Sequence, residues 1–270
     1  VIEENYQMYD AFVVLHGSDT MSYSASALSF MLENLSKPVI FTGSQLPIGD
    51  LRTDAKENLI TAIQVASLRD GNSSVLQEVA LYFEYKLYRG NRSSKINAEH
   101  FNAFASPNYP CLAESGVHLK VGNEYLLKSD KNQSLIVRTS INEDVAIIKL
   151  FPGINETIFA GMVSIPGLKG VVLETYGSGN APTGKGFTDT LKDAISRGIH
   201  IVNVTQCSGG SVNMGQYETS TMLKELGVIS GKDITTEAAI TKLMYLLGQE
   251  IPHNDFKEIF ETPLRGELTK

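Results

Sequence analysis

The sequence predicts an α/β protein with two domains in series, each built on a parallel sheet flanked by helices. Residues 11–15 form a continuous apolar run that meets a glycine and a polar turn, which is typical of a strand buried on both faces of a parallel sheet. Strand-like runs then alternate with helical patterns, and this alternation starts afresh near residue 145. A chain of 270 residues is long enough for two such domains, each with its own core.

The first half contains three predicted strands, at residues 11–15, 39–42 and 79–83. Apolar residues at helical spacing predict helices between them: Leu28, Met31, Leu32 and Leu35, ended by Pro38, and then Leu59, Ala62, Ile63 and Ala66. Residues 88–110 show no sustained period, as in a functional or disordered loop, although Phe101 and Phe104 favour packing. Residues 117–140 alternate weakly, which predicts a hairpin with its turn at 128–134.

The second half repeats the pattern. We place the boundary at residues 140–144, which gives an N-terminal domain of 1–140 and a C-terminal domain of 145–270. Strands are predicted at 145–150, 170–174 and 199–204, with helices near 155–163 and 187–197. Thr235 is the predicted N-cap of a later helix whose apolar face is Ile240, Leu243, Met244 and Leu247.

Composition excludes several classes of function. The chain is 42% hydrophobic and 20% charged with a net charge of −7, and it has no basic stripe, so nucleic acid and membrane surfaces are not expected partners. Its five histidines lack the spacing of metal ligands, and no metal is expected. Without a membrane-length apolar segment or a signal peptide, we expect a cytoplasmic protein. The chain opens Val-Ile-Glu-Glu without Met, so we expect that a preceding segment has been removed.

The turn after the first strand is a candidate site. Residues 16–19 leave that strand at its carboxyl end, where open α/β sheets place their ligands, so Ser18 and Asp19 are candidates. Ser and Asp are also preferred helix N-caps, and local sequence alone favours that role unless Thr20 or Ser22 caps instead. Lys95 leaves a neighbouring strand, and the three side chains together make a hydroxyl, lysine and carboxylate set with Lys95 as base. A nearby carboxylate opposes this role, because it favours the charged form of the lysine.

A glycine-rich stretch in the second half resembles a phosphate-binding loop. Residues 179–186 follow a strand and precede a helix, close to the pattern G-x-x-x-x-G-K-[ST]. The last position is Gly186, which has no hydroxyl for Mg²⁺, and Pro182 removes a backbone donor. An ordinary turn is the preferred interpretation.

Several blocks of sequence together resemble one family, the bacterial L-asparaginases of the cytoplasmic type I group. The blocks are H-G-S-D-T-M at 16–21, T-G-S-Q-L-P at 42–47, R-G-N-R-S-S-K at 89–95, F-A-S-P-N at 104–108, Y-G-S-G-N-A-P at 176–182 and L-R-G-E-L-T at 264–269. They occur in order over essentially the whole chain, which makes the resemblance specific.

The resemblance implies hydrolysis of L-asparagine to L-aspartate and ammonia through a covalent acyl-enzyme, without a cofactor. It implies that Ser18, Asp19 and Lys95 are catalytic, and that Gly17, Ser18, Asp19, Ser44 and Asn180 bind substrate, Asn180 coming from a neighbouring subunit. A larger N-terminal and a smaller C-terminal α/β domain are implied, in a homodimer or homotetramer. Ser18 stands where the family usually has Thr. The family's first strand and a T-G-G-T-I-like motif with a nucleophilic threonine find no match, so this stretch by itself is expected to lack the primary nucleophile.

Three alternatives remain open. One is the asparaginase-like subunit of a tRNA-dependent amidotransferase, which deamidates glutamine and needs a further domain for its partner. Another is a catalytically inactive module that binds asparagine or aspartate. The third is a nucleotide-binding protein that uses residues 179–186.

Overall fold

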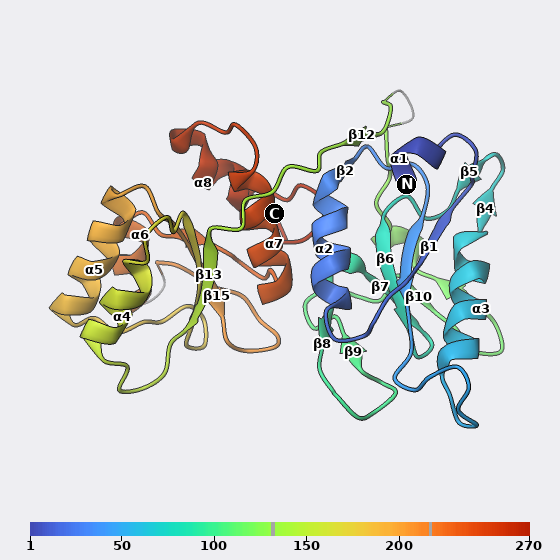
Figure 1. Cartoon of the computed structure of the whole chain (residues 1–270), viewed down its shortest axis with the longest axis horizontal. Coiled ribbons are helices and arrows are strands. Elements are labelled where there is room, and N and C mark those ends of the chain that lie inside the picture. The colour runs from blue at the N-terminus through green and yellow to red at the C-terminus, as the bar shows by residue number, and fades with distance from the viewer. Residues whose placement is uncertain (131–132, 216–217) are drawn as a thin grey trace. The chain divides into compact units, whose positions relative to one another are not determined.

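The computed structural model describes residues 1–130, 133–215 and 218–270, and it divides the chain into two compact units. Unit 1 is Val1–Thr139 and unit 2 is Ser140–Lys270. Each unit contains a sheet with helices packed against it (Figure 1). The α/β fold expected from the sequence is confirmed.

The main sheet of unit 1 is mixed, with the strand order β1-β3-β6-β7-β10-β11. Its strands are β1 Phe12–Leu15, β3 Val39–Thr42, β6 Val79–Phe83, β7 Lys86–Arg89, β10 Ala113–Glu114 and β11 Lys120–Val121. Strands β1, β3 and β6 are parallel, with Phe12 opposite Val39 and Val39 opposite Val79. The following strands pair antiparallel, so the prediction of a parallel sheet holds for only the first three strands.

Helices α2 (Met21–Met31) and α3 (Ala55–Ala66) pack on opposite faces of this sheet. Val39 and Phe41 face the core under α2, whereas Ile40 faces the core under α3, as the alternation of a strand requires. The remaining elements of unit 1 are short: α1 Ile2–Asn5, β2 Leu32–Glu33, β4 Arg69–Asp70, β5 Ser73–Ser74, η1 Gly90–Arg92, β8 Ser94–Lys95, β9 Phe104–Ala105, η2 Asn123–Tyr125 and β12 Ile136–Val137.

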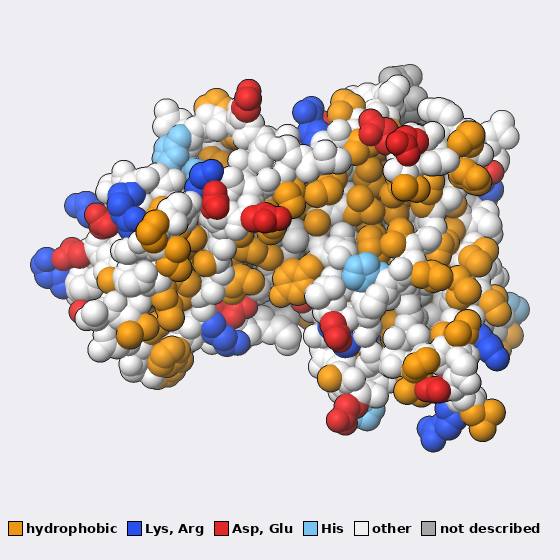
Figure 2. Space-filling view, in the orientation of Figure 1, with side chains coloured by type: hydrophobic (Ala, Val, Ile, Leu, Met, Phe, Trp, Pro, Cys, Tyr) orange, Lys and Arg blue, Asp and Glu red, His pale blue; other side chains and the backbone are white. Residues whose placement is uncertain are grey.

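Strand β1 lies at one end of the described sheet order instead of inside it. The expectation of a strand buried on both faces is therefore wrong: the side chains of β1 are half-buried, and Leu15 is 66% exposed. Figure 2 shows apolar side chains at the surface over this part of unit 1. An edge strand is paired on one side only, so it is covered less than a central strand.

Three local predictions in unit 1 need correction. Helix α2 ends at Met31, well before Pro38, because β2 begins there and pairs with β12. On α3 the buried face is Thr61, Ala62, Val65 and Ala66, whereas Ile63 is exposed. Residues 117–140 form no hairpin among the described residues, since β11 pairs with β10 and β12 pairs with β2. The predicted turn includes residues 131–132, which lie outside the described part.

Unit 2 contains a parallel sheet with the order β13-β14-β15-β16, as predicted. Its elements are β13 Val145–Lys149, α4 Glu156–Val163, β14 Gly170–Thr175, α5 Lys185–Ser196, β15 His200–Thr205, α6 Glu218–Glu225, β16 Ile229–Ser230, α7 Thr236–Leu247 and α8 His253–Glu261. Figure 1 shows α4, α5 and α6 on one side of this sheet and α7 and α8 on the other. Thr235 caps α7 as predicted, because its hydroxyl accepts a hydrogen bond from the Ala238 amide.

Candidate active site

Ser18 and Asp19 follow the carboxyl end of β1 and are free of the helix that comes after them. Helix α2 begins at Met21, and Thr20 stands at its N-cap position. His16 fixes the turn, because its ring bonds to the Gly17 carbonyl at 2.7 Å and to the Ser24 hydroxyl at 2.9 Å. Neither Ser18 nor Asp19 is therefore the N-cap residue of this helix.

Lys95 brings the three predicted catalytic side chains together. Its Nζ donates to Ser18 Oγ at 2.8 Å and to Asp19 Oδ1 at 2.6 Å. The side chain of Lys95 is 16% exposed, whereas that of Asp19 is 91% exposed. The contact between the Ser18 hydroxyl and Lys95 Nζ is thus half-buried, whereas the Asp19 carboxylate is open to solvent.

Lys95 is held by a segment with much more structure than the sequence suggested. It lies in β8, opposite Phe104 of β9, and Phe104 is buried against Phe83 with the ring centroids 4.9 Å apart. Before β8, Arg89 forms a buried ion pair with Glu78 at 2.6 Å, and the Arg89 guanidinium stacks over Tyr109. Side chains far apart in sequence therefore anchor the backbone that carries the lysine.

The charges in this cluster are those of Lys95 and Asp19, which form an ion pair. The hydrogen bond from Lys95 and its positive charge hold the pKa of Asp19 below its usual value, so Asp19 is ionised near neutrality. In this arrangement Lys95 Nζ donates a hydrogen bond to each of the two neighbours. It acts as a base only after it has lost a proton.

The end of β3 lies beside this cluster. Gly43 must be glycine, because a Cβ there would collide with the His16 carbonyl and lie 2.9 Å from the Met21 side chain. The next loop is held by the buried carboxylate of Asp54, which accepts from the backbone amides of Gln45 at 3.0 Å and Leu46 at 3.2 Å. Gln45 in turn accepts a hydrogen bond from Ser18 Oγ at 2.9 Å.

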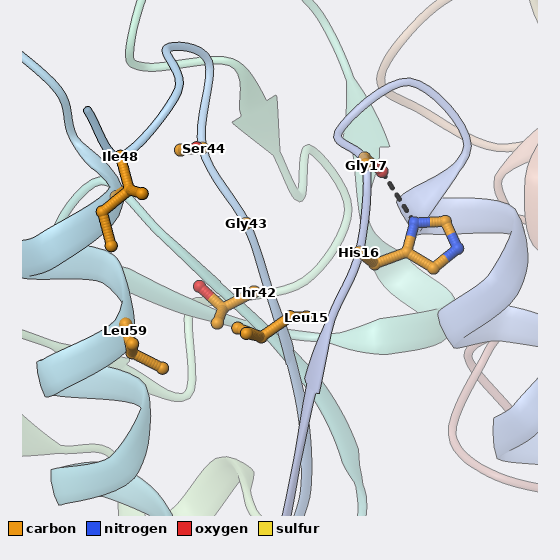
Figure 3. A pocket seen from close by; sticks show the side chains of 9 residues that line it. Leu15, His16, Gly17, Thr42, Gly43, Ser44, Ile48 and Leu59 are labelled. Atoms are coloured by element: carbon orange, nitrogen blue, oxygen red, sulfur yellow. Dashed lines mark hydrogen bonds between the residues drawn. The ribbon is translucent and has the colours of Figure 1, made fainter. Parts of the chain in front are cut away.

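A pocket of about 450 Å³ opens between the ends of β1 and β3. Gly17 and Ser44, both predicted to bind substrate, line it together with Thr42 and apolar side chains such as Leu15 and Leu59 (Figure 3). The structure therefore brings Gly17 and Ser44 to one concave surface, next to the cluster of Ser18 and Lys95.

Asn180 belongs to unit 2. It closes a tight turn after β14, where its backbone bonds in both directions with Tyr176 at 2.9 Å. The glycine-rich turn that follows does not favour a phosphate, because the Glu156 carboxylate lies against Gly186, so close that a Cβ at this position would collide with it. An acidic group thus already stands at the start of α5, the position that an anion would need.

Residues 1–130, 133–215 and 218–270 contain neither a candidate metal site nor a candidate membrane-spanning helix. In these ranges, no three His, Cys, Asp or Glu side chains are grouped so that they could hold a metal ion. Within the same part of the chain, every helix is too short or too polar to cross a membrane.

Comparison with known proteins places the chain in a family. Residues 1–126 match the family described as "Asparaginase, N-terminal", and residues 144–260 match "Glutaminase/Asparaginase C-terminal domain". The chain belongs to the asparaginase family. The expectation that it lacks a segment with the primary nucleophile stays a prediction.

Individual relatives match this chain over nearly its whole length. It is similar to L-asparaginase 1 of Escherichia coli, with 46% identity over 99% of this chain and 77% of that protein. It is also similar to the 60 kDa lysophospholipase of Mus musculus, with 44% identity over 99% of this chain and 46% of that protein. The crystal structure of L-asparaginase I from Vibrio cholerae superposes with a TM-score of 0.90 at 42% identity, covering all of this chain and 79% of that one.

Sequence reasoning missed one polar residue of the cluster. Gln45 stands within the block T-G-S-Q-L-P at 42–47, and the sequence by itself assigns it no role. The available signal was its position directly after Ser44 at a strand end, where side chains of neighbouring strands converge.

Proposed function

We propose that the protein hydrolyses L-asparagine to L-aspartate and ammonia. The observation that supports this most directly is the position of Lys95 Nζ, within 2.8 Å of the Ser18 hydroxyl and 2.6 Å of the Asp19 carboxylate. A hydroxyl nucleophile, a proton acceptor and a group that orients the acceptor suffice to cleave an amide without a cofactor.

In the proposed mechanism, a nucleophilic hydroxyl attacks the side-chain amide carbon of asparagine while Ser18 and Lys95 relay its proton. The tetrahedral intermediate then loses ammonia, which takes up that proton, and an ester between the nucleophile and the aspartyl group remains. Water attacks this ester and releases aspartate, which restores the nucleophilic hydroxyl.

Asp19 links substrate binding to the activation of Lys95. Its carboxylate is 91% exposed, so the α-ammonium group of asparagine can reach it from solvent. The substrate ammonium then shares the carboxylate with Lys95, which weakens the ion pair between Asp19 and Lys95. Binding of the correct substrate therefore prepares the base.

The other residues that the resemblance implies complete the proposed binding site. Gly17 and Ser44 line the pocket beside the cluster, where the substrate side chain would lie. Asn180 is proposed to act from a neighbouring subunit of a homodimer or homotetramer. A cytoplasmic location is part of the same proposal and is supported by the resemblance to the type I group.

The test is ammonia release from L-asparagine by the purified protein, with intact mass measured on the same sample. We expect release by the wild type, and at least a hundredfold loss in the Ser18→Ala variant. Release unaffected by Ser18→Ala would overturn the catalytic role of Ser18. Binding of asparagine without ammonia release would favour a binding module, and a strong preference for L-glutamine would favour the amidotransferase alternative.

A further inference from the structure

The loop that follows β3 and the start of α3 supply most of the wall of the pocket beside the cluster. Six of its nine lining residues belong to this stretch: Thr42, Gly43, Ser44, Ile48, Ala55 and Leu59. Figure 3 shows Ile48 and Leu59 on one side of the pocket and His16 and Gly17 on the other. The shape of the pocket therefore depends on how the loop at 43–54 is folded.

Asp54 closes this loop from its far end. It stands at the N-cap position of α3, yet among the described residues its buried carboxylate bonds to no amide at the start of that helix. It accepts instead from the backbone amides of Gln45 at 3.0 Å and Leu46 at 3.2 Å. The Thr53 hydroxyl takes the local role, because it accepts from the Ala55 amide at 3.0 Å and donates to the Leu46 carbonyl at 3.0 Å. The carboxylate thus serves the loop and not the helix.

Asn58 holds the same loop from below. The Asn58 side chain is fully buried, and its Nδ2 donates to the Gly43 carbonyl at 3.0 Å and to Asp54 Oδ2 at 3.2 Å. Its Oδ1 accepts from the Glu84 amide at 3.0 Å, in the turn between β6 and β7, which ties the loop to the sheet. Ser44 follows Gly43 directly, and the amide after it is one of those that Asp54 holds. The backbone is therefore fixed on both sides of Ser44.

We propose that Asp54 is a positioning residue for the substrate: together with Asn58, its buried carboxylate holds the loop around Ser44 and fixes one wall of the pocket. Two carboxylate oxygens can accept from several N–H groups at once. An amide at this position would offer one acceptor oxygen and add two donors, so the N–H groups of the loop would compete for that oxygen and part of the loop would be released. This inference rests on the proposed function, which assigns the pocket to the substrate side chain.

The test compares Asp54→Asn with the wild type in three measurements. Ammonia release gives kcat and KM for L-asparagine, calorimetry gives Kd for L-aspartate, and amide hydrogen exchange reports on residues 43–54. We expect KM and Kd to rise about 5- to 30-fold, because the wall that holds the substrate is no longer fixed. Since the contact between Lys95 and Ser18 does not involve the loop, kcat should fall less than about fivefold. Exchange at the Gln45 and Leu46 amides should become at least about fivefold faster.

A control variant and a milder variant accompany Asp54→Asn. Glu57→Gln, in the first turn of α3, removes the same charge from the same helix, but its side-chain oxygen can still accept from the hydroxyls of Thr61 and Tyr82. It should leave KM, Kd and exchange unchanged. Thr53→Val removes only the half-buried hydroxyl that clasps the loop and keeps the Asp54 carboxylate. It should raise KM and Kd about 2- to 5-fold, and it can be measured even if Asp54→Asn does not fold.

The outcomes separate this inference from the proposed function. Ammonia release with unchanged KM and Kd in Asp54→Asn would overturn the role of Asp54 and leave the function standing. A wild type that binds L-aspartate but releases no ammonia would refute the function, and weaker binding by Asp54→Asn would then still support the inference.

Three other results would overturn the inference. The first is a rise of the same size in Glu57→Gln, since loss of charge alone would then explain the effect. The second is an unfolded Asp54→Asn together with unchanged KM and Kd in Thr53→Val, because Asp54 would then be needed for folding only. The third is a wild type that neither binds L-aspartate nor releases ammonia, which would refute the proposed function as well.

Discussion

Replacement of Lys95 by Met is the substitution that best separates catalysis from stability. It removes the hydrogen bonds to Ser18 and Asp19 but keeps an unbranched apolar stem of similar length. The ion pair with Asp19 contributes little to folding, because the Asp19 side chain is 91% exposed and water screens the interaction. The proton acceptor is lost completely, and loss of a general base lowers kcat about 10²- to 10⁴-fold.

The assay compares ammonia release and thermal unfolding for Lys95→Met and a matched control. Lys185→Met is suitable, because Lys185 pairs with Asp189 at the same N–O distance of 2.6 Å on the exposed surface of α5. We expect both variants to unfold within a few degrees of the wild type. Only Lys95→Met should lose activity.

Two results would refute this reasoning. If Lys95→Met retained more than about a tenth of the wild-type kcat, Lys95 would not be the base. If kcat of Lys95→Met fell severalfold only together with a much larger fall in unfolding temperature than Lys185→Met shows, the loss of activity would reflect folding and not proton transfer.

Three further predictions test separate parts of the molecule. Asp19→Asn should raise KM for asparagine about 10- to 100-fold, measured by ammonia release, because a neutral amide no longer pairs with the α-ammonium group. Lys242→Met should lower the free energy of unfolding in urea by about 3–5 kcal/mol, because it leaves the fully buried Glu267 carboxylate without its cation; a change below about 1 kcal/mol would contradict this. Burial, and secondly the charge of His253, lower the pKa of His200 to about 4. The unfolded chain therefore binds a proton that the folded chain excludes, and stability should fall as the pH decreases from about 6.5 to about 4. His200→Phe, which can keep the stack on Phe256, should show a smaller fall between pH 7.5 and 5.0.

Much of the fold could be predicted, because strands and helices depend on local patterns. The apolar runs at 39–42 and 79–83 coincide with β3 and β6, and Thr235 caps α7 as its position suggested. The candidate cluster was predictable in part for the same reason, since Ser18 and Asp19 stand where a strand ends. Which of them would cap the helix could not be read from sequence, because capping and site residues are the same types.

The predictions that failed depend on partners remote in sequence. Ile63 has the right spacing for a buried face, but burial on α3 is decided by which side faces the sheet, and Ile63 is 52% exposed. The weak alternation of 117–140 predicts a hairpin, yet β12 pairs with β2, about a hundred residues earlier. A period in sequence gives the direction of side chains but not the identity of the surface that they meet.

By itself the sequence determined the α/β class, the order of most strands and helices, and the residue types available for chemistry, because these follow from local propensity and hydrophobic period. The tertiary structure alone decided that β1 lies at one end of the described sheet, that Lys95 meets Ser18 across 77 positions, and that Ser18 donates a hydrogen bond to Gln45. Hydrogen bonds act over about 3 Å, so a partnership between residues far apart in the chain exists only once sheet pairing and packing have brought them together.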